Sequence, residues 1–142
     1  MNKDVTAVST LDCKNFVAGL REEFAYRSVN IVTNWRGGAP VAIHLNNVLP
    51  NSTLTLLKYQ TYTDAPPDVI TLYDDWDTRK KVTLFIDDMC ETGESSAGCV
   101  AWLKRIKEVT EVDERYIVSK NYAKKATIFV SKAMKVTFPW EV

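Results

Sequence analysis

The chain has 142 residues, enough for one ordinary domain with a real hydrophobic core. Its 18 basic and 18 acidic residues balance, so the composition indicates neither nucleic acid nor an anionic membrane as a partner. There is no apolar run of about 20 residues, no secretory signal, and no metal-ligand spacing among Cys13, Cys90 and Cys99. We therefore expect a single cytoplasmic domain over residues 1–142, with free thiols.

The first third of the chain combines two helical patterns with a short extended one. We expect a helix over about 11–26, capped by Thr10, whose apolar face is formed by Cys13, Phe16, Val17, Leu20 and Phe24. The β-branched run 29–33 predicts a strand, which Gly37-Gly38 ends. A second helix begins around Pro40, whose missing N–H is harmless in a first turn, and its inward residues are Val41, Leu45, Val48 and Leu49.

The middle of the chain is predicted to be mostly extended. Residues 54–57 form a strand, and 59–68, which contains Pro66-Pro67, form an open loop. We expect a hairpin next, in which a polar turn at 74–77 joins strands 69–73 and 82–86. The second of these strands is apolar on both faces, which is typical of a central parallel strand.

The last part of the chain returns to alternating patterns. A helix is expected over about 95–108, with one side formed by Cys99, Trp102, Leu103 and Ile106. Strands are expected near 116–119 and 126–130. Alternating strands and helices predict an α/β fold whose mainly parallel twisted sheet is flanked by helices.

The most informative segment reads Phe-Ile-Asp-Asp-Met-Cys-Glu-Thr-Gly-Glu-Ser-Ser, from Phe85 to Ser96. Ligands of open α/β sheets bind at the carboxyl ends of strands, where Asp87 and Asp88 lie. The free N–H groups of the following helix start suit a phosphate, with hydroxyls from Thr92, Ser95 and Ser96 nearby. Two carboxylates suit the vicinal hydroxyls of a sugar, so the segment predicts a sugar-phosphate site. The alternative is a tight strand-to-helix turn with ordinary capping residues.

This segment resembles the signature of the type I phosphoribosyltransferases: an apolar strand, an acidic pair, two variable residues, an acidic residue or alanine, then Thr-Gly-x-Thr/Ser. The resemblance implies that Asp87 and Asp88 hold the ribose hydroxyls. It places the 5′-phosphate of phosphoribosyl pyrophosphate in the loop formed by Glu91, Thr92, Gly93, Glu94 and Ser95. Glu91 matches an acidic position that assists proton movement near the base, so Glu91, Asp87 and Asp88 form the expected catalytic set. Glu94 is a departure, since a carboxylate beside a phosphate loop repels its ligand.

Two further segments extend the resemblance. Trp35-Arg36-Gly37-Gly38 lies where the family has a pyrophosphate-binding loop with an unusual peptide geometry, so Arg36 and Gly37 are expected to bind pyrophosphate. A helix-start turn with a surface arginine is the alternative. Thr61-Tyr62 resembles the start of the mobile loop that closes over the reacting sugar, although a long surface loop is equally consistent.

The C-terminal segment is similar to the bacterial and archaeal xanthine-guanine enzymes in residues 127–129 and in Phe-Pro-Trp-Glu at 138–141. In those enzymes a lysine after the strand contacts the oxygen on C6 of the base, and Lys132 is the candidate here. Lys135 stands where an aromatic residue normally stacks on the purine, and the segment from Ala133 to Thr137 is shortened. We therefore expect a reduced hood over the base.

The resemblance implies an enzyme that transfers the 5-phosphoribosyl group of phosphoribosyl pyrophosphate to a purine-type base, with a 6-oxopurine favoured and pyrophosphate released. Mg²⁺ is the expected cofactor, held mostly by substrate oxygens and only indirectly by Asp87 and Asp88. A homo-oligomer is expected. Two alternatives stay open: a non-catalytic sensor of nucleotides or phosphoribosyl pyrophosphate with the same fold, and a related transferase acting on another base or amide.

Overall fold

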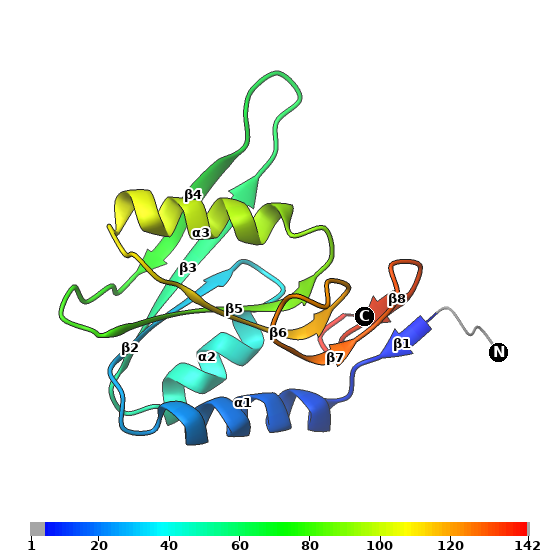
Figure 1. The fold of residues 1–142 in the computed structure, drawn as a ribbon, viewed down its shortest axis with the longest axis horizontal. Coiled ribbons are helices and arrows are strands. Elements are labelled where there is room, and N and C mark those ends of the chain that lie inside the picture. Colours follow the sequence, from blue (N-terminus) through cyan, green and yellow to red (C-terminus); the bar gives the residue numbers. More distant parts are fainter. Residues whose placement is uncertain (1–4, 142) are drawn as a thin grey trace.

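The computed structural model describes residues 5–141 as a six-stranded sheet flanked by three helices, beside a small two-stranded sheet (Figure 1). The strand order of the large sheet is β4-β3-β2-β5-β6-β7. The elements are β1 (Val5–Ala7), α1 (Thr10–Phe24), β2 (Val29–Asn34), α2 (Ala39–Val48), β3 (Ser52–Gln60), β4 (Asp68–Asp74), β5 (Val82–Cys90), α3 (Glu94–Ile106), β6 (Asp113–Ser119), β7 (Ala126–Phe129) and β8 (Lys135–Thr137). No helix in this part of the chain is long and apolar enough to cross a membrane.

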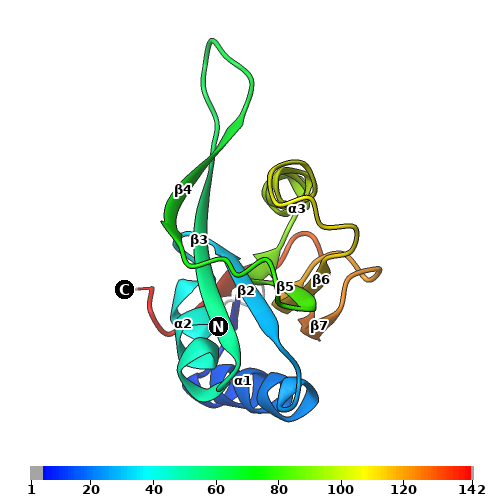
Figure 2. The same cartoon turned by 90° about the vertical axis from the view of Figure 1, so that its left-hand side faces the viewer.

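The predicted α/β fold is confirmed. β2 pairs in parallel with β3 and β5, and β5, β6 and β7 continue the parallel arrangement, whereas β3 and β4 pair antiparallel. Helices α1 and α2 cover one face of the sheet and α3 covers the other (Figure 2). β5 lies between β2 and β6 and alternates between the two cores: Leu84 and Ile86 face α1 and α2, and Phe85 faces α3. This position explains why the strand is apolar on both faces.

The helix α1 buries the predicted face, Cys13, Phe16, Val17, Leu20 and Phe24. Its cap is Ser9 rather than Thr10, because Ser9 forms a capping box: its Oγ accepts from the Asp12 N–H at 3.0 Å, and Asp12 Oδ2 accepts from the Ser9 N–H at 2.8 Å. In α3, Ile106 is half exposed, contrary to its predicted inward position, because the helix ends there.

The predicted hairpin between residues 69–73 and 82–86 is wrong. β4 instead pairs with β3, and the connecting segment 61–67 forms the tip of a long hairpin that projects from the body (Figure 1). β4 tolerates this edge position because nearly all its side chains are exposed. β5, by contrast, needs cover on both faces and is therefore central.

The C-terminal tail also forms structure that the sequence patterns did not predict as strands. β8 pairs in parallel with β1, and the rings of Phe138 and Trp140 stack with centroids 5.2 Å apart. Val136 and Phe138 are buried in the core that α1 and α2 share. The segment after β7 thus forms, together with β1, a small sheet that is separate from the main one.

Candidate active site

The acidic pair lies at the carboxyl end of β5, the central strand. Asp87 is 4% exposed and Asp88 is half-buried. One carboxylate oxygen of Asp87 accepts from the Asp88 N–H at 2.9 Å, and Asp88 accepts from the Met89 N–H at 2.8 Å. Burial, and then the neighbouring Asp88 carboxylate, raise the pKa of Asp87 well above its ordinary value. Asp87 is therefore a poorly hydrated acceptor, which gains strongly from a hydroxyl donor.

The loop between β2 and α2 passes directly over this acidic pair. A Cβ atom on Gly38 would lie 2.9 Å from both the Cα of Asp87 and the carbonyl oxygen of Ile86, and a Cβ on Gly37 would lie 2.6 Å from the Asp88 carboxyl carbon. At Gly38, where the contacts include backbone atoms of β5, only glycine permits so close an approach, whereas the contact at Gly37 is with a side-chain carboxylate that can rotate. The Trp35–Arg36 peptide bond is cis, and Arg36 is exposed at the loop surface.

The third part of the site is the turn into α3. Gly93 has φ +84°, a left-handed conformation that favours glycine, and α3 starts without a side-chain cap. The first intrahelical bond runs from the Ala97 N–H to the Gly93 carbonyl at 2.9 Å. Within residues 5–141, the N–H groups of Ser95 and Ser96 have no acceptor. An uncapped helix start with free N–H groups is an anion site.

These three segments enclose one cavity of about 350 Å³. Its lining residues are Asn34, Trp35, Gly37, Asp87, Asp88, Met89, Cys90, Glu91, Thr92, Gly93, Ser95 and Ser96. The structure therefore brings together most of the residues singled out in the sequence. Arg36 and Glu94 adjoin the cavity without lining it, and Lys132 lies beyond β7 with an exposed side chain.

Sequence reasoning missed Lys120, which follows β6 directly. Its side chain is buried, and Nζ donates to Glu91 Oε1 at 2.8 Å and to the Lys132 carbonyl at 3.1 Å. β6 pairs with β5 through Ser119 and Cys90, so an ammonium group lies at the edge of the acidic site. A charged residue immediately after an apolar strand was the available signal, since the carboxyl ends of neighbouring parallel strands meet at one edge.

The donor set fits a metal ion only in part. Residues 5–141 contain no cluster of three or more histidine, cysteine or acidic side chains that could hold a cation. Asp87 and Asp88 offer two neighbouring carboxylates, which fits an ion such as Mg²⁺ that keeps most of its ligands from phosphates and water. The protein therefore supplies at most a minor share of the coordination.

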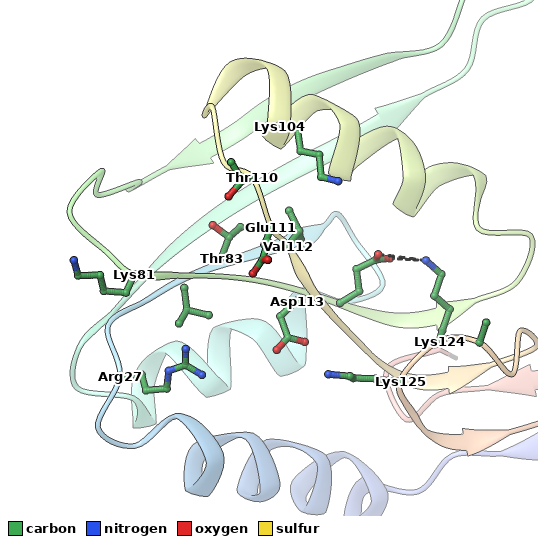
Figure 3. Close-up of a pocket in the computed structure, with 13 residues that line it drawn as sticks. Arg27, Lys81, Thr83, Lys104, Thr110, Glu111, Val112, Asp113, Lys124 and Lys125 are labelled. Carbon is green, nitrogen blue, oxygen red and sulfur yellow. Dashed lines mark hydrogen bonds and ion pairs between the residues drawn. The ribbon is translucent and has the colours of Figure 1, made fainter.

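A larger cavity of about 610 Å³ lies at the other end of the sheet, at the amino ends of β5 and β6 (Figure 3). Both basic and acidic side chains line it, the basic ones in the majority, and Lys124 pairs with Glu114 at 3.1 Å. Asp113, another lining residue, pairs with Arg115 at 2.7 Å. Its adjacent acids, Asp113 and Glu114, lie at the amino end of β6 and are already paired with basic side chains, and no helix start within residues 5–141 lines it, so it lacks the features of the site at β5.

The fold is that of the type I phosphoribosyltransferases. A purine phosphoribosyltransferase from Pyrococcus horikoshii Ot3 superposes with a TM-score of 0.77 at 19% identity, covering 98% of this chain and 95% of that one. The Helicobacter pylori xanthine-guanine-hypoxanthine phosphoribosyltransferase gives 0.69 at 18% identity, covering 97% and 94%. A hypothetical protein from Neisseria gonorrhoeae with bound ppGpp gives 0.70 at 16% identity, covering 100% and 92%.

No protein-family profile and no curated protein sequence matches the chain. The similarity is therefore one of fold, which confirms the architecture that the resemblance implied. Activity and substrate have to be argued from the site itself.

Proposed function

We propose that the protein transfers the 5-phosphoribosyl group from phosphoribosyl pyrophosphate to a purine-type base, favouring a 6-oxopurine, and releases pyrophosphate. One observation carries the proposal: in a single cavity, an acidic pair formed by buried Asp87 and half-buried Asp88 lies beneath the loop that contains Gly37 and Gly38, called here the glycine loop, and beside an uncapped helix start. A sugar that carries a phosphate at one end and a pyrophosphate at the other has three groups that match these three parts.

Each part has a distinct task in binding. The free N–H groups of Ser95 and Ser96 face the 5′-phosphate, favoured by the dipole of α3. The ribose hydroxyls donate to Asp87 and Asp88, and the backbone around Gly37 receives the pyrophosphate, with Arg36 near its charge. In the reaction the bond from the anomeric carbon to pyrophosphate breaks while a bond to a base nitrogen forms. Orientation of the two reactants contributes about 7–11 kcal/mol in well-aligned cases.

The base is expected beside Glu91 and Lys120. The Lys120 ammonium is a donor only, so it favours a base with an oxygen acceptor on C6 over one with an amino donor. Glu91 is well exposed beside it and would accept the proton that the base nitrogen releases. Lys132, whose carbonyl group holds Lys120, stays the alternative donor to the base.

Mg²⁺ is proposed as the cofactor, bound mainly by pyrophosphate and ribose oxygens with Asp87 and Asp88 close by. When bound, it would neutralise charge on the leaving group. The residues of the chain would position the sugar, exclude water and hold the leaving group at the glycine loop. A homo-oligomer is also proposed.

A second candidate is a sensor that binds a nucleotide or phosphoribosyl pyrophosphate without turnover. It is supported by the likeness to the ppGpp-bound Neisseria gonorrhoeae protein and by Lys135 in the place of a stacking aromatic residue. The intact acidic pair supports the enzyme, because a sensor has no need to bind the ribose in a reactive orientation.

The deciding experiment measures pyrophosphate release from phosphoribosyl pyrophosphate and Mg²⁺ with hypoxanthine, guanine, xanthine or adenine. The proposal predicts turnover with the three oxopurines and little with adenine. The matched control is the double variant Asp87→Asn with Asp88→Asn, which should fold and show no release. Tight binding of phosphoribosyl pyrophosphate or ppGpp without turnover of any base would select the sensor instead.

A further inference from the structure

Glu94 poses an electrostatic problem for the proposed phosphate site. It is the first residue of α3 and directly follows Gly93, so the same turn that would bind the 5′-phosphate also carries its carboxylate. A carboxylate in the first turn stabilises a helix, yet it repels an anion bound at the same N–H groups. A site that binds phosphate therefore needs this side chain to be directed elsewhere.

The structure directs it toward β3. The hydroxyl of Tyr59 donates to Glu94 Oε1 at 2.9 Å, and Glu94 is absent from the lining of the acidic cavity. Partial burial, and then the hydrogen bond and charge of Glu94, raise the pKa of Tyr59, so its hydroxyl keeps the proton that it donates. The contact joins β3 and α3, two elements that are distant in sequence.

Two further features of the structure hold Tyr59 in place for its hydrogen bond to Glu94. A Cβ atom on Gly98 would lie 2.5 Å from Tyr59 Cε2 and 2.7 Å from Cδ2, so the ring crosses α3 only because residue 98 has no side chain. The backbone N–H of Tyr59 donates to Asn34 Oδ1 at 3.1 Å, which fixes the residue independently of its ring. Removing the hydroxyl alone would therefore leave the position of the strand unchanged.

We propose that Tyr59 is a positioning residue for the 5′-phosphate site, because it holds the Glu94 carboxylate on the β3 side of α3 and away from the bound anion. The inference rests on the proposed function, whose phosphate site it refines. Without the hydroxyl, Glu94 is free to rotate toward the loop and to oppose the phosphate. The role is indirect, so the effect of Tyr59 must disappear when Glu94 loses its charge.

The test is a double-mutant cycle of Tyr59→Phe and Glu94→Gln, read by calorimetric binding of ribose 5-phosphate and by the KM for phosphoribosyl pyrophosphate. Tyr59→Phe should weaken binding and raise KM roughly tenfold with kcat little changed, the size expected for losing a hydrogen bond to a charged group. In the Glu94→Gln background, Tyr59→Phe should have no further effect. Tyr73→Phe is the matched control and should bind like the wild type, because Tyr73 is half exposed on the same hairpin and pairs with Leu56, which packs against the core of α1 and α2 rather than against α3.

Gly98→Ala gives a second approach that does not alter the hydroxyl. The added methyl group displaces the Tyr59 ring, so it should weaken ribose 5-phosphate binding, and Glu94→Gln should restore it. If Tyr59→Phe and Gly98→Ala weaken binding equally with and without the Glu94→Gln change, Tyr59 only supports the fold and the inference is overturned. Unchanged binding in Tyr59→Phe would overturn it too. A wild type that binds neither ligand would instead refute the proposed function.

Discussion

Gly38→Ala is the substitution that most directly probes how closely the loop after β2 packs against β5, the strand that carries Asp87 and Asp88. The added Cβ atom would lie 2.9 Å from the Cα of Asp87 and 2.9 Å from the carbonyl oxygen of Ile86. It would also meet the hydroxyl of Thr33, which is buried and has no hydrogen-bond partner within residues 5–141. Two of these contacts are to the backbone of the central strand, so rotation of a side chain cannot relieve them.

The cost follows from this geometry. Forcing one extra carbon into a well-packed interior destabilises proteins by about 1–3 kcal/mol. For a domain of this size, each kcal/mol lowers the melting temperature by about 3–4 °C, so a decrease of roughly 3–12 °C is expected. The loop would also move away from the acidic pair, which should weaken binding of the pyrophosphate group.

Two other glycines serve as controls in the same melting assay. Gly19 is exposed on α1 and has no atom within 4 Å of an added Cβ, so Gly19→Ala should stabilise the protein by about 1 kcal/mol through helix propensity. Gly37 meets only the Asp88 carboxylate, which can rotate, so Gly37→Ala should preserve stability while displacing that carboxylate and weakening binding. If the Gly38→Ala variant had the same melting temperature as the wild type, the close packing of the Gly38 loop against β5 would be refuted.

Two further predictions concern charged groups. Asp87→Asn should stabilise the fold by about 1–3 kcal/mol at neutral pH while abolishing turnover, because an uncompensated buried carboxylate is costly. Burial raises the pKa of Asp87 in the folded protein above its ordinary 3.8, so folding takes up a proton at pH values between the two. The free energy of unfolding of the wild type therefore falls as the pH rises from 3.8 through the raised pKa. In urea unfolding, the extra stability of the Asp87→Asn variant should vanish below pH 3.8. Lys120→Met should lower kcat/KM for oxopurines by about 10–100-fold, as expected for losing a hydrogen bond from a charged donor, and should narrow their preference over adenine. If Lys132→Ala removes the preference instead, Lys132 contacts the base.

Local patterns predicted the elements well where burial follows a simple period. The apolar face of α1 and the strand β5, which is apolar on both faces, were predicted from residue spacing. In each case the pattern of apolar residues within one element shows which of its faces is buried. The motif from Phe85 to Ser96 was predicted for the same reason: a strand end, a turn and a helix start are all contiguous in the sequence. Their meeting in one cavity follows from the chain itself.

What the sequence did not reveal depends on contacts between distant segments. β4 pairs with β3 rather than with β5. The apolar strand β5 has to be buried in the centre of the sheet, which leaves the exposed strand β4 at the edge, and no pattern within β4 itself names its neighbour. The importance of Lys120 emerges only once β6 lies beside β5, and Tyr59 carries no local sign of its contact with Glu94. Position in the sheet therefore assigned roles that residue type and spacing left open.

The central claim is that the cavity at the end of β5 binds a phosphoribosyl group. Its most direct test is calorimetric titration of phosphoribosyl pyrophosphate with Mg²⁺, in the absence of any base, into the wild-type protein and the double variant Asp87→Asn with Asp88→Asn. Saturable binding by the wild type, lost in a double variant that remains folded, is the predicted result. No binding by the wild type at millimolar ligand, or equal binding by both proteins, would contradict the claim.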